Sequence, residues 1–314
     1  PRNIYDDLHQ IPELGFEEFK TSAYLADKLE AMGYKVTRNI GGTGVIGEIK
    51  GSEPGPVMML RADMDALPFL IDGEKKNIHA CGHDAHSAML LAAASELVGK
   101  VKRGTLRILF QQGEETLKGA LAVIDAGVIE DVDIALGLHI RPVQDIAYGE
   151  MSPAVRHASS TFVNVVINGL SSHGARPHLG VNAIEAAAVA INAITAIKIN
   201  PIIPWSCKVT GIKGGGVAPN IIPDKVEMIV DARAQTNEAM TELLEKLRRA
   251  VTNAAAALGA TAEVTTPGGV IPAAEYDDEL TAEVAECIVE VVGEEKLAKE
   301  LVNPGGEDFH YFVN

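Results

Sequence analysis

Short apolar runs alternate with segments of helical spacing through the first 140 residues, which restricts the chain to few architectures. Helical spacing covers 18–33, which ends at Gly33, and also 87–99 and 119–127. Runs typical of strands lie between them, at 34–40, 45–51, 56–65, 106–112 and 133–140. Strands that alternate with helices predict an α/β domain with a mixed, largely parallel sheet.

Beyond residue 155 the order of the predicted elements changes. Strands over 160–169, 205–215, 221–234 and 261–268 are interleaved with helices over 181–197 and 237–259. This β-α-β-β-α-β order is that of a ferredoxin-like domain. A further helix over 276–293 needs a sheet to pack on, so we expect the ferredoxin-like part to be an insertion. We therefore assign 1–154 and 267–314 to one discontinuous domain and 155–266 to the inserted domain.

The composition narrows the classes of partner and location. A net charge of −16 argues against nucleic acid and anionic membrane surfaces as partners. The cysteines Cys81, Cys207 and Cys287 are odd in number and far apart, which argues against a disulfide framework and for a reducing, cytoplasmic location. No apolar run approaches the ~20 residues that span a bilayer, and the first residues lack a signal-peptide core.

The densest cluster of ligand-type side chains is the segment IHACGHDAHS, with three histidines, one cysteine and one aspartate. Cys81 and His83 stand just before a helix that we expect to begin near Asp84. Thiolate and imidazole together suit zinc or another borderline-soft divalent ion. His79 and His86 are candidate ligands or supporting residues. The alternative is a thiol nucleophile, Cys81, activated by His83 and oriented by Asp84.

Further side chains of this kind fall at predicted strand ends: Asp63, Glu114, Glu115 and His139. In sheets of this class, ligands bind beyond the carboxyl ends of the strands. Neighbouring carboxylates on a strand point opposite ways, so one glutamate of the QQGEE segment could bind metal while the other accepts a proton. Each feature also has a structural alternative. Asp63 or Asp65 could form an ion pair with Arg61, the QQGEE segment could be a solvated acidic turn, and His139 could be a structural histidine.

In the inserted domain, three residues stand out by their surroundings. His173 lies in the loop segment SSHGARPH, Asn220 follows the glycine-rich turn GGGVAPN, and Arg233 lies on a predicted strand. Each by itself is more typical of a loop or a strand edge than of a functional site.

These motifs in this order resemble the co-catalytic metallopeptidase family of aminoacylases and glutamate carboxypeptidases. The closest likeness is to its amidohydrolase branch of hippurate and indole-acetyl-amino-acid hydrolases. It covers almost the whole chain through HQIPELGFEE, RADMDALP, HACGHDAH, GEE, GLHI, SSHGARPH, APNIIPD and GGEDFHYF, and the pair RADMDALP with HACGHDAH is specific to that branch. The resemblance implies a catalytic α/β domain interrupted by a ferredoxin-like lid that often dimerises.

The resemblance also implies the roles of the residues. It implies these metal ligands: Cys81, which bridges two divalent ions (zinc or manganese), and His83, Glu115 and His139. Glu114 is then the general base and Asp63 the carboxylate that positions a ligand. From the lid, His173 of this chain or of the partner subunit stabilises the oxyanion, and Asn220 and Arg233 hold the substrate. The family's last ligand histidine follows the segment EDFHYF, and this sequence ends at Asn314, so we expect one metal position to be empty or weakly held.

The implied function is metal-dependent hydrolysis of the amide bond of N-acyl amino acids or similar small conjugates. A metal-bound water is the implied nucleophile, with Glu114 as its base. We expect a small-molecule substrate and a homodimer formed through the lid. The alternatives are a non-catalytic metal- or ligand-binding relative with an incomplete site, an aminopeptidase or dipeptidase, and thiol hydrolysis through Cys81.

Overall fold

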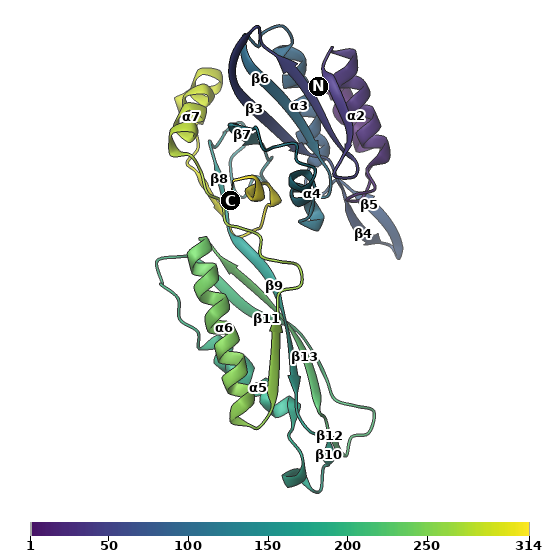
Figure 1. Cartoon of the computed structure of the whole chain (residues 1–314), viewed down its shortest axis with the longest axis vertical. Coiled ribbons are helices and arrows are strands. Elements are labelled where there is room, and N and C mark those ends of the chain that lie inside the picture. Colours follow the sequence, from purple (N-terminus) through teal and green to yellow (C-terminus); the bar gives the residue numbers. More distant parts are fainter. Residues whose placement is uncertain (1, 314) are drawn as a thin grey trace. The chain divides into compact units, whose positions relative to one another are not determined.

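The computed structural model describes residues 2–313, which form two compact units (Figure 1). The first unit holds the described residues up to Gly149 and those from Glu307 onward, and the second holds Glu150–Gly306. This division differs from the predicted one in the segments 150–154 and 267–306, which group with the second unit. The reason is strand pairing, since β15 (Leu301–Asn303) pairs with β8 (Val155–His157) in a parallel ladder.

A five-stranded mixed sheet in the order β1-β2-β6-β3-β7 forms the centre of the first unit. The strands are β1 (Lys35–Ile40), β2 (Gly44–Lys50), β3 (Glu53–Asp63), β6 (Arg103–Gln111) and β7 (Ile134–Gly137). β6, β3 and β7 are parallel, whereas β1 and β2 form a hairpin that runs antiparallel to β6. The sheet is therefore mixed as predicted, but only two of its four pairings are parallel, because the hairpin supplies the other two.

Helices pack on both faces of this sheet. They are α1 (Arg2–His9), α2 (Phe19–Ala31), α3 (His83–Leu97) and α4 (Gly119–Asp125), followed at the chain end by the short helix η4 (Asp308–Phe312). Side chains of β6 alternate between two cores, since Phe110 packs in the cluster that contains Leu29 and Leu91, and Leu109 in the cluster that contains Val123. Burial on both faces explains why consecutive residues of β6, Ile108 to Phe110, are all apolar.

The register of the parallel strands aligns their carboxyl ends. Asp63 at the end of β3 is paired with Gln111 at the end of β6, and Arg61 is paired with Gly137 at the end of β7. The segments that follow these strands therefore begin at one edge of the sheet.

The second unit contains a four-stranded antiparallel sheet in the order β11-β13-β9-β14. Its elements follow the chain as β9 (Ser159–Asn168), α5 (Ala183–Thr195), β11 (Trp205–Gly214), β13 (Lys225–Ala234), α6 (Asn237–Ala257) and β14 (Thr261–Thr265). Figure 1 shows α5 and α6 beside each other along this sheet. Buried and exposed residues alternate along β13, so one face of the sheet forms the core with the two helices.

Most predicted elements are confirmed within two or three residues, and the elements that were not predicted are short. α7 (Asp278–Val292) matches the predicted helix over 276–293, and β12 (Ile221–Ile222) pairs with β10 (Ser172–His173). Helix α1 and the hairpin of β4 (Leu67–Ile71) and β5 (Glu74–Ile78) were not predicted. The Asp72-Gly73 turn of the hairpin, with both φ angles positive, is nevertheless a typical hairpin signal. Among the described helices, none combines the length and apolar character needed to cross a membrane.

The core of the second unit gives a direct test of its packing. Leu247 on α6 is fully buried, whereas Leu258 just after α6 is 43% exposed. We expect Leu247→Ala to lower the free energy of unfolding of this unit by about 2–5 kcal/mol because it leaves a cavity. Trp205, the chain's single tryptophan, packs against this core, so its fluorescence during urea unfolding reports on the unit. Leu258→Ala is the control, and an equal loss in both variants would contradict this account.

Candidate metal centre

The aligned strand ends bring the predicted ligands together in the first unit. Asp63 is the last residue of β3, Glu114 and Glu115 begin the short helix η1 (Glu114–Thr116) after β6, and His139 follows β7 by two residues. Cys81 and His83 lie at the start of α3 and flank Gly82, whose φ of +86° is accessible mainly to glycine.

His83 lies at the centre of this group. Its Nε2 atom is 3.8 Å from Glu115 Oε1, 3.9 Å from Glu114 Oε2 and 3.8 Å from Asp63 Oδ2. Ligand-type atoms of His83, Cys81 and His139 lie within 4.8 Å of one another, and the Cys81 Sγ to His139 Nε2 distance is 3.5 Å. Two possible ligand groups, one with Glu114 and Glu115 and one with Cys81 and His139, therefore share His83.

Two orphaned atoms support a cation in this place. His83 Nε2 and Glu115 Oε1 are buried, and neither has a hydrogen-bond partner among the described residues. A buried polar atom without a partner is costly, so atoms of this kind that face each other indicate a missing ligand. Thiolate, imidazole and carboxylate donors together match a borderline divalent ion. The residues present thus fit the metal that the sequence predicts.

The surroundings of His83 are strongly anionic. Burial lowers the pKa of His83, but the Asp63 charge and the Asp65 hydrogen bond outweigh it and raise this pKa to about 12. Burial raises the pKa of Glu114 well above its usual range, and the charges of Glu307 and Asp308 add to this effect. A site that holds protons this tightly on an imidazole and a carboxylate also favours a divalent cation in their place.

The histidines are oriented by carboxylates on their other ring nitrogens. His83 Nδ1 is 3.0 Å from Asp65 Oδ1, and His86 Nδ1 is 2.6 Å from Asp63 Oδ1. On its far side, His86 Nε2 accepts a hydrogen bond from the Ile140 amide at 2.9 Å. Asp65, rather than Asp63, is therefore the hydrogen-bond partner of His83 Nδ1, and such a carboxylate fixes the tautomer of a ligand histidine. His86 is held in a supporting place.

Arg61 forms the ion pair that was the alternative interpretation of the RADMDALP segment, and it forms two more. Its Nη1 lies 2.8 Å from Asp63 Oδ2, and its Nη2 lies 3.1 Å from Glu307 Oε1 and 2.9 Å from Asp308 Oδ1. Gln111 completes the cluster by accepting from Arg61 Nε. Burial raises the pKa of Asp63, but the charges of His83 and Arg61 outweigh it and hold this pKa well below its usual range.

The geometry does not support the thiol alternative in the form that has Asp84 as the orienting group. Asp84 contacts His9 Nδ1 at 2.6 Å and accepts from the Ala85 amide, while His83 is paired with Asp65. A triad of Cys81, His83 and Asp84 therefore does not form in the described structure, because its third member faces a different histidine.

The three predicted residues of the second unit are not gathered in one place. Asn220 Nδ2 and His173 Nε2 lie 3.4 Å apart beside the β10–β12 pairing, and both residues are exposed. Arg233 lies towards the far end of β13, where it donates to Asp231 Oδ1 and to the Pro304 carbonyl, both at 2.9 Å. The structure joins His173 to Asn220, and it places Arg233 elsewhere in the same sheet.

Sequence reasoning assigned no role to the chain's last acidic residues. Glu307 and Asp308 lie with Glu114 in a further group of possible ligand atoms, and Asp308 also accepts from Gln111 and from the Ala120 amide. Both residues lie in the segment GGEDFHYF, which is one of the motifs that carry the family resemblance. Next to them His310 is 2% exposed, and burial lowers its pKa to about 4.

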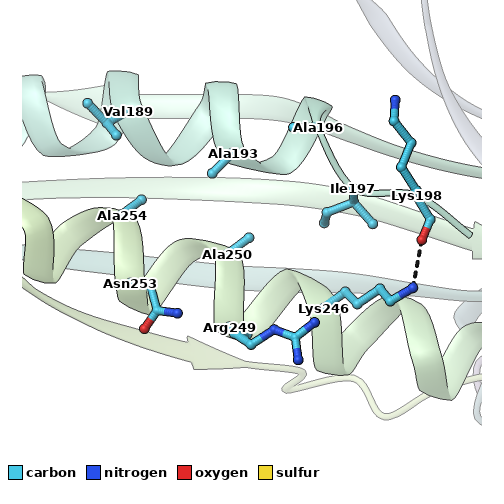
Figure 2. Close-up of a pocket in the computed structure, with 10 residues that line it drawn as sticks. All are labelled: Val189, Ala193, Ala196, Ile197, Lys198, Lys246, Arg249, Ala250, Asn253 and Ala254. Atoms are coloured by element: carbon cyan, nitrogen blue, oxygen red, sulfur yellow. Dashed lines mark hydrogen bonds between the residues drawn. The ribbon is translucent and has the colours of Figure 1, made fainter.

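A groove of about 610 Å³ lies between α5 and α6 in the second unit (Figure 2). Its floor is apolar, with Ala193, Ile197 and Ala250, and Lys198 and Arg249 lie on its rim. No histidine, cysteine or carboxylate lines it, so it lacks the donors that the predicted chemistry requires.

Imidazole, thiol and carboxylate side chains at the carboxyl ends of an α/β sheet are the hallmark of a metal-dependent hydrolase. The profile of peptidase family M20/M25/M40 matches residues 59–314, and the chain belongs to this family. It is 35% identical to thermostable carboxypeptidase 1 of Saccharolobus solfataricus over 98% of this chain and 81% of the relative. It is 33% identical to the hippurate hydrolase of Campylobacter jejuni over 98% of this chain and 84% of the relative.

A solved structure of the same family is similar throughout. The YXEP protein of Bacillus subtilis, a dinuclear metal-binding peptidase of the M20 family, is 30% identical, with a TM-score of 0.83. The match covers 99% of this chain and 84% of that protein. The chain is therefore a hydrolytic enzyme of a family of metal-dependent amidohydrolases and peptidases, and the predicted α/β fold with mixed sheets is confirmed at this level.

His310 provides a pH-dependent test of the packing around the site. Its pKa in the folded protein is about 4, below the ordinary 6.5. Between these two pH values His310 is therefore protonated in the unfolded chain and neutral in the folded chain. Stability from this group is present above pH 6.5 and is lost as the pH falls to about 4. In wild type this loss amounts to up to about 3 kcal/mol of the free energy of unfolding. We expect His310→Asn, which does not titrate, to lack it. Urea unfolding of the metal-free protein, followed by circular dichroism, measures it. Identical pH profiles for wild type and variant would contradict the expectation.

Proposed function

We propose that this enzyme hydrolyses the amide bond of N-acyl amino acids and similar small conjugates, with divalent ions held by Cys81, His83, Glu115 and His139. The observation that carries the proposal is the pair of orphaned atoms, His83 Nε2 and Glu115 Oε1, which face each other beside Glu114 at the ends of parallel strands. Zinc and manganese are the ions we expect, because thiolate and imidazole donors suit zinc and carboxylate donors suit manganese.

The substrate class follows from what the similar enzymes have in common. A hippurate hydrolase cleaves an acyl group from an amino acid, and a carboxypeptidase releases an amino acid from the end of a peptide. Both kinds of substrate place a free carboxylate one carbon away from the scissile amide nitrogen. We propose that this shared unit, an acylated amino acid with a free carboxylate, is recognised here, and that Arg233 binds its polar groups together with Asn220 of a second copy, because the two residues lie apart within one chain.

Bound divalent ions would lower the pKa of a nearby water and polarise the substrate carbonyl. In our proposal Glu114 accepts the proton of the attacking water at its carboxylate. It then donates this proton to the nitrogen of the leaving amine, so that it ends the cycle ionised. His173 donates a hydrogen bond to the carbonyl oxygen as negative charge develops there.

Glu114 suits the role of base better than its neighbour Glu115. It is almost fully buried, and burial together with the charges of Glu307 and Asp308 raises its pKa well above the usual range. A carboxylate with a raised pKa is a stronger proton acceptor near neutral pH. Glu115 instead directs its orphaned oxygen at His83, as a ligand would.

The four-stranded sheet of the second unit with α5 and α6, within the predicted 155–266, is in this proposal a ferredoxin-like lid inserted into the catalytic domain. Its β-α-β-β-α-β order and antiparallel sheet support the assignment. β11 lies at one edge of that sheet, and an open edge can pair with the same strand of a second copy, so we propose a homodimer through it. A reducing, cytoplasmic location would keep the Cys81 thiol available as a ligand.

Exchanging the two glutamates separately tests their division of labour. We expect Glu114→Gln to lower kcat by about 10²–10⁴-fold because it removes the base and keeps the shape. Bound metal, measured by elemental analysis, should stay at the wild-type level. Glu115→Gln should lose metal at the same free ion concentration. The exposed Glu17→Gln is the control. Near-normal turnover by Glu114→Gln would contradict the mechanism.

Removal of metal separates the proposed function from its alternatives. We expect hydrolysis of a panel of N-acyl amino acids to stop in chelator and to return when Mn²⁺ or Zn²⁺ is added. The panel includes dipeptides with a free amino group, whose exclusive cleavage would indicate an aminopeptidase or dipeptidase. Activity that ignores chelator but is abolished by a thiol-alkylating agent would favour Cys81 as a nucleophile. No hydrolysis of any substrate by the metal-loaded protein would favour a non-catalytic relative.

A further inference from the structure

Glu18 is a fully buried carboxylate of the first unit that has no role in the predicted metal site or in the proposed mechanism. It stands at the end of the HQIPELGFEE segment, directly before α2, and is 0% exposed. Its Oε2 accepts a hydrogen bond from Thr43 Oγ1 at 2.5 Å, and its Oε1 accepts one from the Gly113 amide at 2.9 Å. Buried carboxylates are costly, so one that serves a loop amide needs a reason.

Gly113 begins the turn that leads from β6 into Glu114. Its φ of +62° lies in the left-handed region, and a Cβ atom there would lie 2.6 Å from the Phe16 ring. The backbone before Glu18 therefore packs directly on this turn. Gly15 confirms this proximity, since a Cβ added to it would lie 3.0 Å from the Gly113 Cα.

A second buried carboxylate holds the other side of the same turn. Asp65 Oδ2 accepts a hydrogen bond from the Glu115 amide at 3.0 Å. Glu18 and Asp65 thus accept from the amides of the residues immediately before and after Glu114. With both amides fixed, the backbone at Glu114 has little freedom to rotate, and its carboxylate is directed towards His83.

We propose that Glu18 is a positioning residue, which fixes the left-handed turn at Gly113 and thereby the place of the Glu114 carboxylate. This inference rests on the role proposed for Glu114 as the proton acceptor. Misplacement of a catalytic group by a fraction of an ångström lowers the rate of the chemical step while substrate binding is little changed.

The chain offers a matched control in Glu13. Its carboxylate also accepts from a threonine hydroxyl and from backbone amides, namely Thr21 Oγ1 at 3.1 Å, Thr21 N at 2.9 Å and Lys20 N at 2.9 Å. These bonds hold the first turn of α2 and do not involve the segment around Glu114. Loss of the Glu13 carboxylate should therefore affect stability without affecting the turn at Gly113.

We expect Glu18→Met, which fills the space but accepts no hydrogen bond, to lower kcat by about 10–100-fold with KM within about threefold of wild type. Glu18→Gln should restore most of kcat, because its amide oxygen can accept from the Gly113 amide and its NH₂ can donate to Thr43 Oγ1. Glu13→Met should keep the wild-type kcat. If Glu18→Met does not fold, Thr43→Val should give the same changes at smaller amplitude.

Amide hydrogen exchange on the metal-free protein supplies a readout that needs no activity. Glu18→Met should exchange faster over 111–116, and Glu13→Met faster over 18–22. If wild type hydrolyses nothing, the proposed function fails while this exchange result still tests the Glu18 bond. Three results would overturn the inference: an unchanged kcat in Glu18→Met, no rescue by Glu18→Gln, or equal effects of the Glu18 and Glu13 variants on 111–116.

Discussion

Arg61 is the cation on which the functional edge of the first unit depends. Only 2% of it is exposed, and its guanidinium contacts Asp63, Glu307 and Asp308. Removing one partner from a buried ion cluster typically costs about 3–5 kcal/mol, because the remaining charges stay in the protein interior. Without Arg61, three carboxylates from the end of β3 and from the last described turn would repel one another. The cluster therefore ties the end of the chain to the strand ends that form the site.

Carboxylates from other parts of the chain also hold two histidines and one turn of this edge. Asp65 orients His83, Asp63 orients His86, and Glu18 holds the turn before Glu114. This arrangement holds the candidate ligands and the proposed base in place through contacts within the protein itself. A preorganised site avoids the cost of ordering its groups during the reaction. It also explains why motifs far apart in the sequence, from HQIPELGFEE to GGEDFHYF, are needed for one site.

The sequence allowed the elements and the ligand types to be predicted, because both are coded locally. Apolar periodicity located β3, β6 and α3, and the strand-end rule then brought Glu115 close to His83. Contacts between distant residues could not be predicted in this way.

Arg61 and Glu307 are 246 residues apart, and no local pattern indicates that they meet. Whether Asp63 or Asp65 faces His83 depends on the rotation of β3 at its last residues, which alternation alone does not fix. The short strands β8 and β15 moved the domain boundary for the same reason, since their pairing joins segments over 140 residues apart.

The surplus of acid at this edge links the stability of the fold to the chemistry of the site. Its carboxylates are Asp63, Asp65, Glu114, Glu115, Glu307 and Asp308, and the Arg61 guanidinium pairs with three of them. Burial, with repulsion from Glu307, raises the pKa of Asp308 to about 7 even though Arg61 opposes it. A divalent ion at His83 and Glu115 would relieve part of this repulsion, so the same ion that the chemistry needs would stabilise the first unit by mass action. The repulsion also keeps Glu114 a strong proton acceptor. Neutralising an acid that does not pair with Arg61 would therefore relieve repulsion in the metal-free fold, at the expense of the metal affinity and the proton acceptor that we propose.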